Sequence, residues 1–364
     1  MKLLVTGSDG FLGRNLIARI NAENIGDVLS YDLFCDKKTL ADYVKNADVI
    51  IHLAGVNRPK AESEFYTGNL ELTEELIKLV NLHNSKAPII FSSTTQIGNG
   101  SEYANSKEMA EKALIDYQKS TGNDVFIYRF PGLFGKWSQP NYNTVVATFC
   151  YNIARDIPIE IRDPNYELTL CYVDDVVDLI LKTIKERKLQ SIEPLYKITL
   201  GQLAAKISDF ASKEDILNIA DMSDLLTKKL YATYISFLPE DKLSYHLTMH
   251  EDERGSFTEV LHLPKHGQVS VSTTKPGITR GDHWHDTKSE KFLVVNGKGI
   301  VRLRRINTSD IIEYPVSADK MEVVDIPPGY THNFTNTGDV DMVTVIWVNE
   351  LLNKDKPDTF FEKV

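Results

Sequence analysis

The sequence predicts an α/β fold with a doubly wound parallel sheet, followed by an all-β antiparallel barrel of the jelly-roll kind. At 364 residues the chain exceeds the length at which one hydrophobic core keeps growing, so two domains are expected. In the first part, short β-rich runs alternate with helix-patterned segments. In the last part, short alternating strands are separated by Gly, Pro and Asn turns. We therefore expect one domain over residues 1–243 and a second over residues 244–364.

The first domain opens with a strand, a turn and a helix. Residues Lys2–Thr6 form a short apolar run ended by glycines, and Phe11–Ile20 then carries apolar residues at helical spacing. Further strands are expected at Val28–Tyr31, Val49–Leu53, Pro88–Ser92 and Val125–Arg129, with helices at Glu71–Val80 and Lys107–Lys119. Strands that alternate with helices in this way build a parallel sheet.

The pattern becomes more irregular and more helical from Asn143 to about Tyr245. Helices are expected at Leu203–Phe210 and Asp221–Tyr231, in a part of the first domain that would cap the substrate. Leu238–Lys242 is the expected linker. Beyond it, strands are expected at Gln268–Thr273, Lys291–Val295, Gly299–Leu303 and Met342–Val348.

Composition places the chain among ordinary globular proteins, with 42% hydrophobic and 25% charged residues. The formal net charge of −10 and the lack of a Lys/Arg-rich run argue against nucleic-acid binding. The three cysteines lie far apart and lack the spacing of a zinc site, which favours a reducing cytoplasm. The N-terminus shows no signal-peptide pattern, and no apolar stretch reaches membrane-spanning length. We expect a cytoplasmic protein without nucleic-acid or membrane partners.

A glycine-rich turn follows the first strand directly. Gly7, Gly10 and Gly13 are spaced so that the backbone can turn tightly and approach a pyrophosphate at a helix N-terminus. The bare spacing also occurs in strand–helix turns without a ligand, but here it stands where a dinucleotide site requires it. Asp32, at the end of the second strand, can accept hydrogen bonds from an adenosine ribose and so favours NAD(H) over NADP(H). The Lys37–Lys38 pair weakens that preference.

Three further residues have the chemistry of a carbonyl reductase. Tyr103 and Lys107 are one helical turn apart, so the Lys107 ammonium can lie beneath the phenol, lower its pKa and hold the nicotinamide ribose. Such a phenol can donate a proton to a ketone. Thr94, which follows a strand, supplies a hydroxyl. Taken alone, the Y-x3-K spacing also fits an ordinary pair on a helix surface.

With these residues, the first domain resembles the extended short-chain dehydrogenase/reductases, which have a Rossmann-type sheet. Further matches are His52–Gly55, Asn69, Arg129–Gly135 and Tyr172–Asp175. In that family the tyrosine is the acid/base, the lysine assists it, the hydroxyl orients the carbonyl, and many members act on nucleotide-linked sugars. The resemblance implies cofactor contacts at Gly7, Gly10, Phe11, Leu12, Gly13, Asp32, Leu53, Ala54, Gly55, Tyr103 and Lys107.

Several polar residues are expected to contact the substrate. The segment Arg129–Ala154 follows the strand that carries substrate contacts in that family, although loop and core packing would explain it equally well. The resemblance implies substrate contacts at Arg58, Asn69, Lys136, Asn141 and Asn143.

Two histidine-containing motifs occupy the C-terminal part. His283 and His285 are two residues apart, so on a strand both side chains point to the same face. Glu290 and His332 can complete a set of four ligands, and three imidazoles with one carboxylate suit Zn²⁺ or a similar divalent ion. A lone histidine is more often a packed or surface residue, but four candidate ligands in two motifs favour a metal centre.

The spacing G-x5-H-x-H-x4-E-x6-G, followed by P-x-G-x2-H-x3-N, resembles the two-part motif of cupin barrels, with Met321 where a glycine usually opens the second part. The barrel also resembles the 3,5-epimerases of dTDP-4-keto-6-deoxysugars at residues 252–259, 277–283 and 326–332. In those enzymes a histidine removes a proton next to a ketone and a tyrosine returns one. The histidine matches His283, whereas the strand at Ile346–Trp347 offers no matching tyrosine.

The proton-transfer residues of the barrel therefore stay open. His283 is a candidate catalytic residue or a metal ligand, and if it binds metal, Lys291 and Asp282 are candidate bases. Arg254 and Arg280, together with Lys291, are candidate contacts to a diphosphate or sugar, or else ordinary surface charges.

Over its whole length the chain resembles a family of bifunctional enzymes of capsular-polysaccharide precursor synthesis, in which a reductase is joined to a cupin. Distinctive segments are residues 52–59, 133–137 and 141–151. The resemblance implies a UDP-linked amino sugar substrate and a homodimer. The barrel would epimerise C3 of a UDP-2-acetamido-2,6-dideoxy-4-keto hexose. The first domain would then reduce the C4 ketone with NADPH to a UDP-N-acetyl-L-talosamine-type sugar, on the way to UDP-N-acetyl-L-fucosamine.

Two alternatives remain. Asp32 favours an NAD-dependent nucleotide-sugar epimerase or dehydratase whose cupin is noncatalytic and serves only for dimerisation. The other alternative is a non-enzymatic sensor of dinucleotide and sugar. Tyr103 and its partners argue against a sensor, because a sensor needs no proton donor at the ketone.

Overall fold

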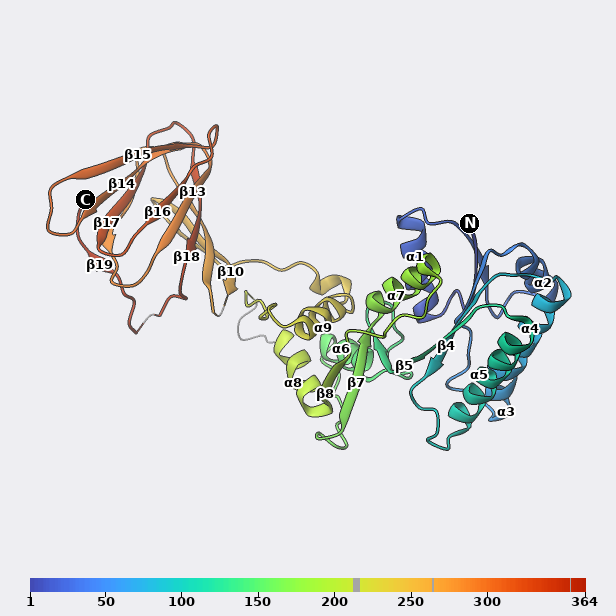
Figure 1. The fold of residues 1–364 in the computed structure, drawn as a ribbon. Coiled ribbons are helices and arrows are strands. Elements are labelled where there is room, and N and C mark those ends of the chain that lie inside the picture. The colour runs from blue at the N-terminus through green and yellow to red at the C-terminus, as the bar shows by residue number, and fades with distance from the viewer. Residues whose placement is uncertain (212–216, 264, 354) are drawn as a thin grey trace. The chain divides into compact units, whose positions relative to one another are not determined.

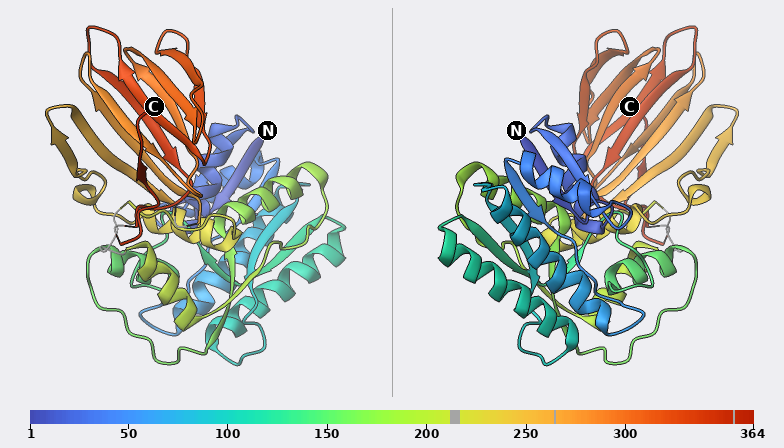
Figure 2. Two further views of the ribbon diagram at one scale, coloured as in Figure 1. Left: turned by 90° about the vertical axis from the view of Figure 1, so that its left-hand side faces the viewer. Right: turned by 90° about the vertical axis from the view of Figure 1, so that its right-hand side faces the viewer.

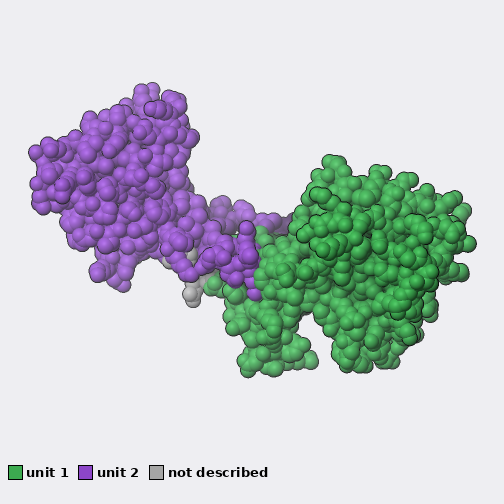
Figure 3. Space-filling model, viewed as in Figure 1, with its two compact units in different colours: residues 1–211, 229–239 green, residues 212–228, 240–364 purple. Residues whose placement is uncertain are grey.

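The computed structural model describes residues 1–211, 217–263, 265–353 and 355–364, and the chain divides into two compact units (Figure 3). The first comprises Met1–Ala211 with Lys229–Pro239, and the second comprises Ser212–Lys228 with Glu240–Val364. The chain passes into the second unit for the last time between Pro239 and Glu240, within the predicted linker. Residues 217–228, expected in the first domain, are grouped with the second, where backbone hydrogen bonds join Leu217 and Ile219 to His262.

The first unit is built on five parallel strands, which confirms the predicted sheet. In the order β2-β1-β3-β4-β5 they are β2 (Asp27–Tyr31), β1 (Lys2–Thr6), β3 (Val49–His52), β4 (Ile89–Thr94) and β5 (Val125–Phe130). The chain places β2 on one side of β1 and β3 on the other. The loops after β1 and β3 therefore leave the carboxyl edge of the sheet at the switch point where such folds bind ligands.

Helices cover both faces of this sheet (Figure 1). On one face pack α1 (Phe11–Ala22) and α7 (Val173–Glu186), and on the other pack α2 (Lys37–Asn46), α4 (Leu72–Leu82) and α5 (Glu102–Thr121). Within β1, Leu3 and Val5 belong to the first core and Leu4 to the second. Because both faces are buried, the strand is apolar throughout rather than alternating.

The rest of the first unit surrounds the end of the sheet. It contains α3 (Ser63–Phe65), a π-helix (Tyr66–Glu71), α6 (Val145–Ala154), α8 (Leu200–Phe210) and a small sheet of β6 (Gly132–Phe134), β7 (Glu167–Tyr172) and β8 (Tyr196–Thr199). Helix α9 (Leu225–Ile235) belongs to the first unit from Lys229 onwards. Helix α9 starts later than predicted, because the Asp224 carboxylate accepts a hydrogen bond from Thr227 N at 3.0 Å and caps the helix there.

The second unit is made of two antiparallel sheets, which confirms the predicted cupin-like barrel (orange and red in Figure 2). One sheet has the order β16-β13-β18-β11-β10-β9 and the other β15-β14-β17-β12-β19. The strands are β9 (Met249–Asp252), β10 (Gly255–Leu263), β11 (Gly267–Thr274), β12 (Thr279–Trp284), β13 (Glu290–Asn296), β14 (Lys298–Arg305), β15 (Ile311–Ser317), β16 (Val323–Ile326), β17 (Tyr330–Asn336), β18 (Met342–Val348) and β19 (Phe360–Phe361). Phe292 and Ile346 of one sheet share a core with Leu303 and Phe334 of the other.

Within the described residues, no helix is both long enough and apolar enough to cross a membrane.

Candidate active site and metal centre

The glycine loop between β1 and α1 lies against the loop that follows β3. Gly7 has φ +71°, and a Cβ there would lie 2.7 Å from Ala54 N. A Cβ on Gly13 would lie 2.1 Å from the Gly7 carbonyl oxygen. Only glycine fits both positions, because other backbone atoms lie directly against them. The approach of a pyrophosphate to this loop stays a prediction. Phe11 and Leu12 form the first turn of α1, and Leu53 N donates to Thr6 O at 3.1 Å, which places the predicted cofactor residues side by side.

Asp32 lies next to this loop, just after β2. Its carboxylate accepts hydrogen bonds from Asp9 N at 2.7 Å and from Leu33 N at 2.8 Å. A carboxylate has about four acceptor sites, so Asp32 can still accept from a ribose. The structure thus keeps the predicted ribose contact possible.

The three predicted catalytic residues of the first unit stand on β4 and α5. Lys107 is 4% exposed, and its Nζ donates to Ser92 O at 2.9 Å. A Cβ on Gly55 would lie 2.9 Å from that Nζ, so Gly55 leaves room beside the ammonium. Burial lowers the pKa of Lys107 to about 8, against the opposing effect of Glu111. Tyr103 lies one helical turn before Lys107, and Thr94 ends β4.

The phenol of Tyr103 differs from the prediction in one respect. Burial raises its pKa above the usual value, while a hydrogen bond with the Thr94 side chain opposes that shift. The predicted lowering of the Tyr103 pKa is therefore wrong for the protein alone, because burial of the phenol outweighs the hydrogen bond with Thr94. A raised pKa keeps the phenol protonated at neutral pH, which suits a proton donor.

In the second unit, the four predicted ligands converge as expected. One nitrogen or oxygen from each of His283, His285, Glu290 and His332 lies within 4.8 Å of the others. The β12–β17 pairing sets His283 opposite His332, and their ring centroids are 4.5 Å apart. Glu290 opens β13 on the facing sheet, and one of its carboxylate oxygens lies 3.0 Å from His332 Nε2 and 3.5 Å from His285 Nε2.

The electrostatics of this cluster favour a cation. Burial raises the pKa of Glu290, but the interactions with His285 and His332 outweigh it and bring the pKa to about 2. Burial lowers the pKa of His283 to about 4, with His332 adding to the effect. Among the described residues, the buried atoms His285 Nε2, Glu290 Oε2 and His332 Nε2 contact one another and have no other hydrogen-bond partner, and His332 Nδ1 has none. Buried atoms without partners are costly, and this donor set fits Zn²⁺ or a similar divalent ion.

Comparison with known proteins agrees with both halves of this description. Residues 3–198 match the model of the NAD dependent epimerase/dehydratase family, and residues 250–360 match the polysaccharide biosynthesis C-terminal domain. The chain belongs to the NAD dependent epimerase/dehydratase family. Its cofactor is therefore a nicotinamide dinucleotide, as predicted from the glycine loop.

Two known proteins match this chain over nearly its whole length. A UDP-2-acetamido-2,6-beta-L-arabino-hexul-4-ose reductase of Pseudomonas aeruginosa is 42% identical over 99% of this chain and 98% of its own. A crystal structure of the capsular polysaccharide assembling protein CapF of Staphylococcus aureus is 45% identical, covers 100% of both chains and superposes with a TM-score of 0.94. A UDP-glucuronic acid 4-epimerase of Bacillus cereus in complex with NAD, 18% identical, covers 67% of this chain and 99% of its own with a TM-score of 0.57, and shares the fold alone.

The residues predicted to contact the substrate fall into two groups, those that are exposed and those that have partners within the protein. Arg58 and Asn143 are exposed, and the Arg58 guanidinium lies 5.7 Å from the centre of the Tyr142 ring. Asn141 is exposed, but its backbone N and its amide bond to Thr148 and Asn152. These residues remain available for a substrate.

Asn69 and Lys136 have partners within the protein instead. The Asn69 amide is 1% exposed, bonds both backbone groups of Val56, and donates to Ser106 Oγ at 2.9 Å. The Lys136 ammonium bonds both carboxylate oxygens of Asp174, at 2.7 and 2.8 Å. The geometry therefore favours supporting roles for both, and the direct substrate contact predicted for Asn69 finds no support.

The basic residues predicted around the barrel site also have partners. Arg254 forms an ion pair with Asp252, and the Arg280 guanidinium donates to the backbone oxygens of Ser256 and Thr273. Lys291 follows Glu290 on β13, so its side chain points to the opposite face of the sheet, where it pairs with Asp325. The prediction of Lys291 as a catalytic residue is therefore wrong.

Sequence reasoning missed a buried network beneath the reductase residues. The Glu111 carboxylate, on α5, accepts from Ser93 Oγ and forms an ion pair with Arg129 at 2.6 Å. It lies one turn after Lys107 and raises the pKa of that lysine. The spacing of four residues between Lys107 and Glu111 on one helix could have indicated that these two side chains interact.

Proposed function

We propose that the chain is a bifunctional nucleotide-sugar enzyme that epimerises C3 of a UDP-2-acetamido-2,6-dideoxy-4-keto hexose and then reduces the C4 ketone. The product would be a UDP-N-acetyl-L-talosamine-type sugar on the way to UDP-N-acetyl-L-fucosamine. The observation that carries the proposal is the presence of two sites in one chain. A hydrogen bond joins the side chains of Tyr103 and Thr94, Lys107 follows Tyr103 by one helical turn, and a histidine–carboxylate cluster lies in the barrel. The full-length likeness to a named UDP-sugar reductase and to a capsule-assembling protein supports it.

In the reductase step, the residues of the first unit would handle the ketone oxygen. A bound nicotinamide cofactor would supply the hydride that C4 receives. Tyr103, kept protonated by burial, donates its proton to the oxygen that becomes the C4 hydroxyl, and Thr94 orients that oxygen. Lys107, beside Gly55, would hold the nicotinamide ribose. Solvent then reprotonates the phenol, so the step consumes one hydride and one proton.

In the epimerase step, the barrel would exchange the proton at C3, which the neighbouring C4 ketone acidifies. His283, His285, Glu290 and His332 would hold the divalent ion, whose chemistry is Lewis-acid polarisation of a carbonyl. His283 is the least buried of the three histidines, so it is the one most open to a substrate. Epimerisation has to come first, because reduction removes the ketone and fixes the configuration at C3.

The proposal extends to cofactor, assembly and location. NADPH is the proposed reductant, with NADH as the alternative that Asp32 favours, and Zn²⁺ is the proposed metal. A homodimer in the cytoplasm is proposed on the resemblance of the whole chain and on three free cysteines.

The second candidate function is an NAD-dependent nucleotide-sugar epimerase or dehydratase with a noncatalytic dimerising barrel. The observation in its favour is Asp32, whose carboxylate lies at the glycine loop and would repel a ribose 2′-phosphate. Such an enzyme keeps tightly bound NAD and needs no added reductant.

The deciding experiment incubates the purified protein with UDP-2-acetamido-2,6-dideoxy-4-keto hexose in D₂O. Oxidation of NADPH and of NADH is followed by absorbance, and deuterium at C3 by NMR. Oxidation with deuteration supports both activities. In that case Tyr103→Phe should abolish oxidation and leave C3 exchange, whereas His283→Ala should abolish exchange.

Two results would contradict the proposal. Exchange without oxidation of either cofactor would remove the reductase assignment. If neither signal appears while NAD remains bound through purification, the epimerase or dehydratase alternative gains support.

A further inference from the structure

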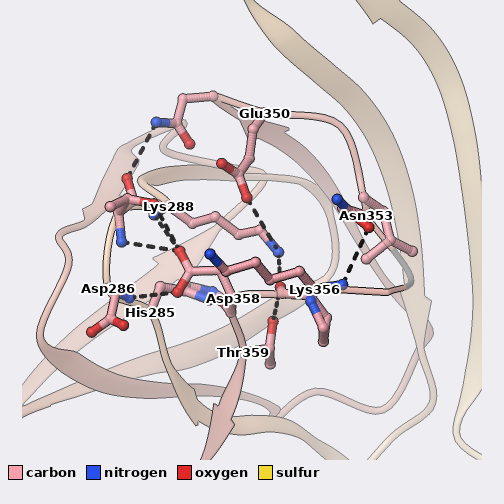
Figure 4. Close-up of polar contacts among 12 residues, drawn as sticks. His285, Asp286, Lys288, Glu350, Asn353, Lys356, Asp358 and Thr359 are labelled. Carbon is pink, nitrogen blue, oxygen red and sulfur yellow. Dashed lines mark hydrogen bonds and ion pairs between the residues drawn. The ribbon is translucent and has the colours of Figure 1, made fainter.

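The C-terminal residues of the chain run beside the strand that carries the metal-ligand histidines. The short strand β19 pairs with β12, setting Phe361 opposite His283 and Phe360 opposite Trp284. The rings of Trp284 and Phe360 stack with centroids 4.7 Å apart. This pairing fixes the preceding residues, 357–359, next to the loop that follows His285 (Figure 4).

Asp358 contacts His285 through its backbone. The distance from His285 Nδ1 to the Asp358 carbonyl oxygen is 2.6 Å. A carbonyl oxygen can only accept, so Nδ1 must carry the hydrogen in this bond. In a neutral imidazole the lone pair then lies on Nε2, which is the His285 nitrogen buried in the histidine–carboxylate cluster. The bond therefore selects the tautomer that a metal needs.

The side chain of Asp358 holds that carbonyl in place. Its two carboxylate oxygens accept from the backbone N of Asp286, Thr287 and Lys288, at 2.9, 3.0 and 3.1 Å, and from Thr287 Oγ1 at 3.0 Å. The residue has φ +40°, in the left-handed region that a non-glycine residue adopts only when its surroundings impose it. Four hydrogen bonds to one side chain provide that constraint.

Lys288 ties the same segment from the other side. Lys288 is 5% exposed, and its ammonium donates a hydrogen bond to the Pro357 carbonyl oxygen. The same ammonium nitrogen lies 3.8 Å from a Glu350 carboxylate oxygen (Figure 4). The loop that joins His285 to Glu290 is thus fixed at its backbone and at this lysine by residues near the C-terminus. Both of its ends carry candidate metal ligands.

We propose that Asp358 is a positioning residue for the barrel's metal centre. Its backbone carbonyl sets the tautomer of His285, and its carboxylate fixes the loop between His285 and Glu290. This inference rests on the metal centre of the proposed function and adds a residue outside both histidine motifs. The carbonyl and carboxylate of Asp358 bond to protein groups, and the residue would act on the metal only through His285 and this loop.

The test compares three variants of the full-length protein. Asp358→Ala removes the four carboxylate hydrogen bonds. Asp358→Asn is the milder change, because its amide keeps one oxygen but turns an NH₂ group towards N–H donors. Asp355→Ala is the control, since it removes the same charge from an exposed residue of the same segment.

Zinc affinity is measured by competition with a chelating dye, and the Co²⁺-loaded proteins are compared by absorption. Loss of a partner that orients a metal ligand typically costs about 10- to 100-fold in affinity, so Asp358→Ala should bind Zn²⁺ that much more weakly. Asp358→Asn should fall between Asp358→Ala and the native protein, and Asp355→Ala should match the native protein. In ¹⁵N-histidine NMR, the native protein should show a slowly exchanging Nδ1 proton on His285 that Asp358→Ala loses. A purely structural role would lower the melting temperature without changing this signal.

The outcomes separate the inference from the proposed function. If the native protein binds Zn²⁺ and both Asp358 variants bind it equally well, the positioning role is refuted and the metal centre stands. If the native protein itself binds neither Zn²⁺ nor Co²⁺, the metal centre fails and the positioning role fails with it.

Discussion

Replacing Lys107 by methionine should stabilise the protein freed of its cofactor, because the native side chain keeps an ammonium group away from water. Burial brings the Lys107 pKa from 10.5 to about 8. At ~1.4 kcal/mol per pKa unit, holding the charged form in the fold costs roughly 3 kcal/mol. Methionine is of similar length and is a good helix former. It loses the hydrogen bond to Ser92 O, worth about 1.5 kcal/mol for a charged donor. The expected gain at pH 7 is therefore about 2 kcal/mol.

The pH dependence of this gain has a definite sign. The folded pKa of Lys107, about 8, lies below the unfolded value of 10.5. Between these values the unfolded chain holds more protons, so the native protein gains stability as pH rises, while the variant gains nothing from this position. The cost is complete below pH 8 and disappears by the unfolded pKa. The stabilities of the two proteins should therefore cross between about pH 8 and the unfolded pKa of 10.5.

The assay is urea unfolding of both proteins, freed of cofactor, across this pH range and followed by far-UV circular dichroism. Lys112→Met, an exposed lysine on the same helix, is the matched control and should change stability by less than about 0.5 kcal/mol. Other titrating groups cancel in the difference between variant and native protein. A Lys107→Met variant that is less stable at pH 7, or a difference that does not vary with pH, would refute the electrostatic argument.

Three more predictions concern the cofactor, the metal and the buried network. Asp32→Ser should raise the ratio of kcat/KM for NADPH to that for NADH by about tenfold, or ~1.4 kcal/mol, through loss of a carboxylate near the ribose; an unchanged ratio would show that Asp32 does not select the cofactor. EDTA should lower the melting temperature of the second unit only, because free Zn²⁺ at 100 times its Kd contributes about 2.7 kcal/mol. Calorimetry that shows both units shifting equally would contradict a metal confined to the barrel. Glu111→Gln should cost about 2 kcal/mol in urea unfolding, because the buried Glu111 carboxylate loses its charged bonds to the half-exposed Arg129 guanidinium.

Most of the fold could be predicted from local sequence patterns. The strands expected at Lys2–Thr6 and Met342–Val348 occur at those residues, because a fully buried or alternating apolar run is recorded in consecutive side chains. The metal cluster was predictable for the same reason. His283 and His285 share a strand face by their spacing, and the two motifs supply the rest.

Some predicted site residues have protein partners that sequence spacing does not record. Lys136 pairs with Asp174, 38 residues along the chain, and Asn69 is held by the backbone of Val56. Lys291 is different, because strand alternation already excluded it once Glu290 was placed in the cluster. The role proposed for Asp358 could not be predicted from the sequence, for another reason. It acts on His285 through a backbone carbonyl, a group that every residue possesses.

The two sites share a physical property that links stability to function. The first keeps the Lys107 ammonium buried with Ser92 O as its acceptor. The second buries atoms of His285, Glu290 and His332 that, among the described residues, contact only one another. Folding alone would not retain such groups, since apolar residues of similar shape would be more stable in their place. They are therefore best explained by ligands that interact with them. The native chain accepts a less stable fold at both sites in exchange for binding, which is why the substitution that removes the Lys107 charge should stabilise the protein and abolish its reductase activity together.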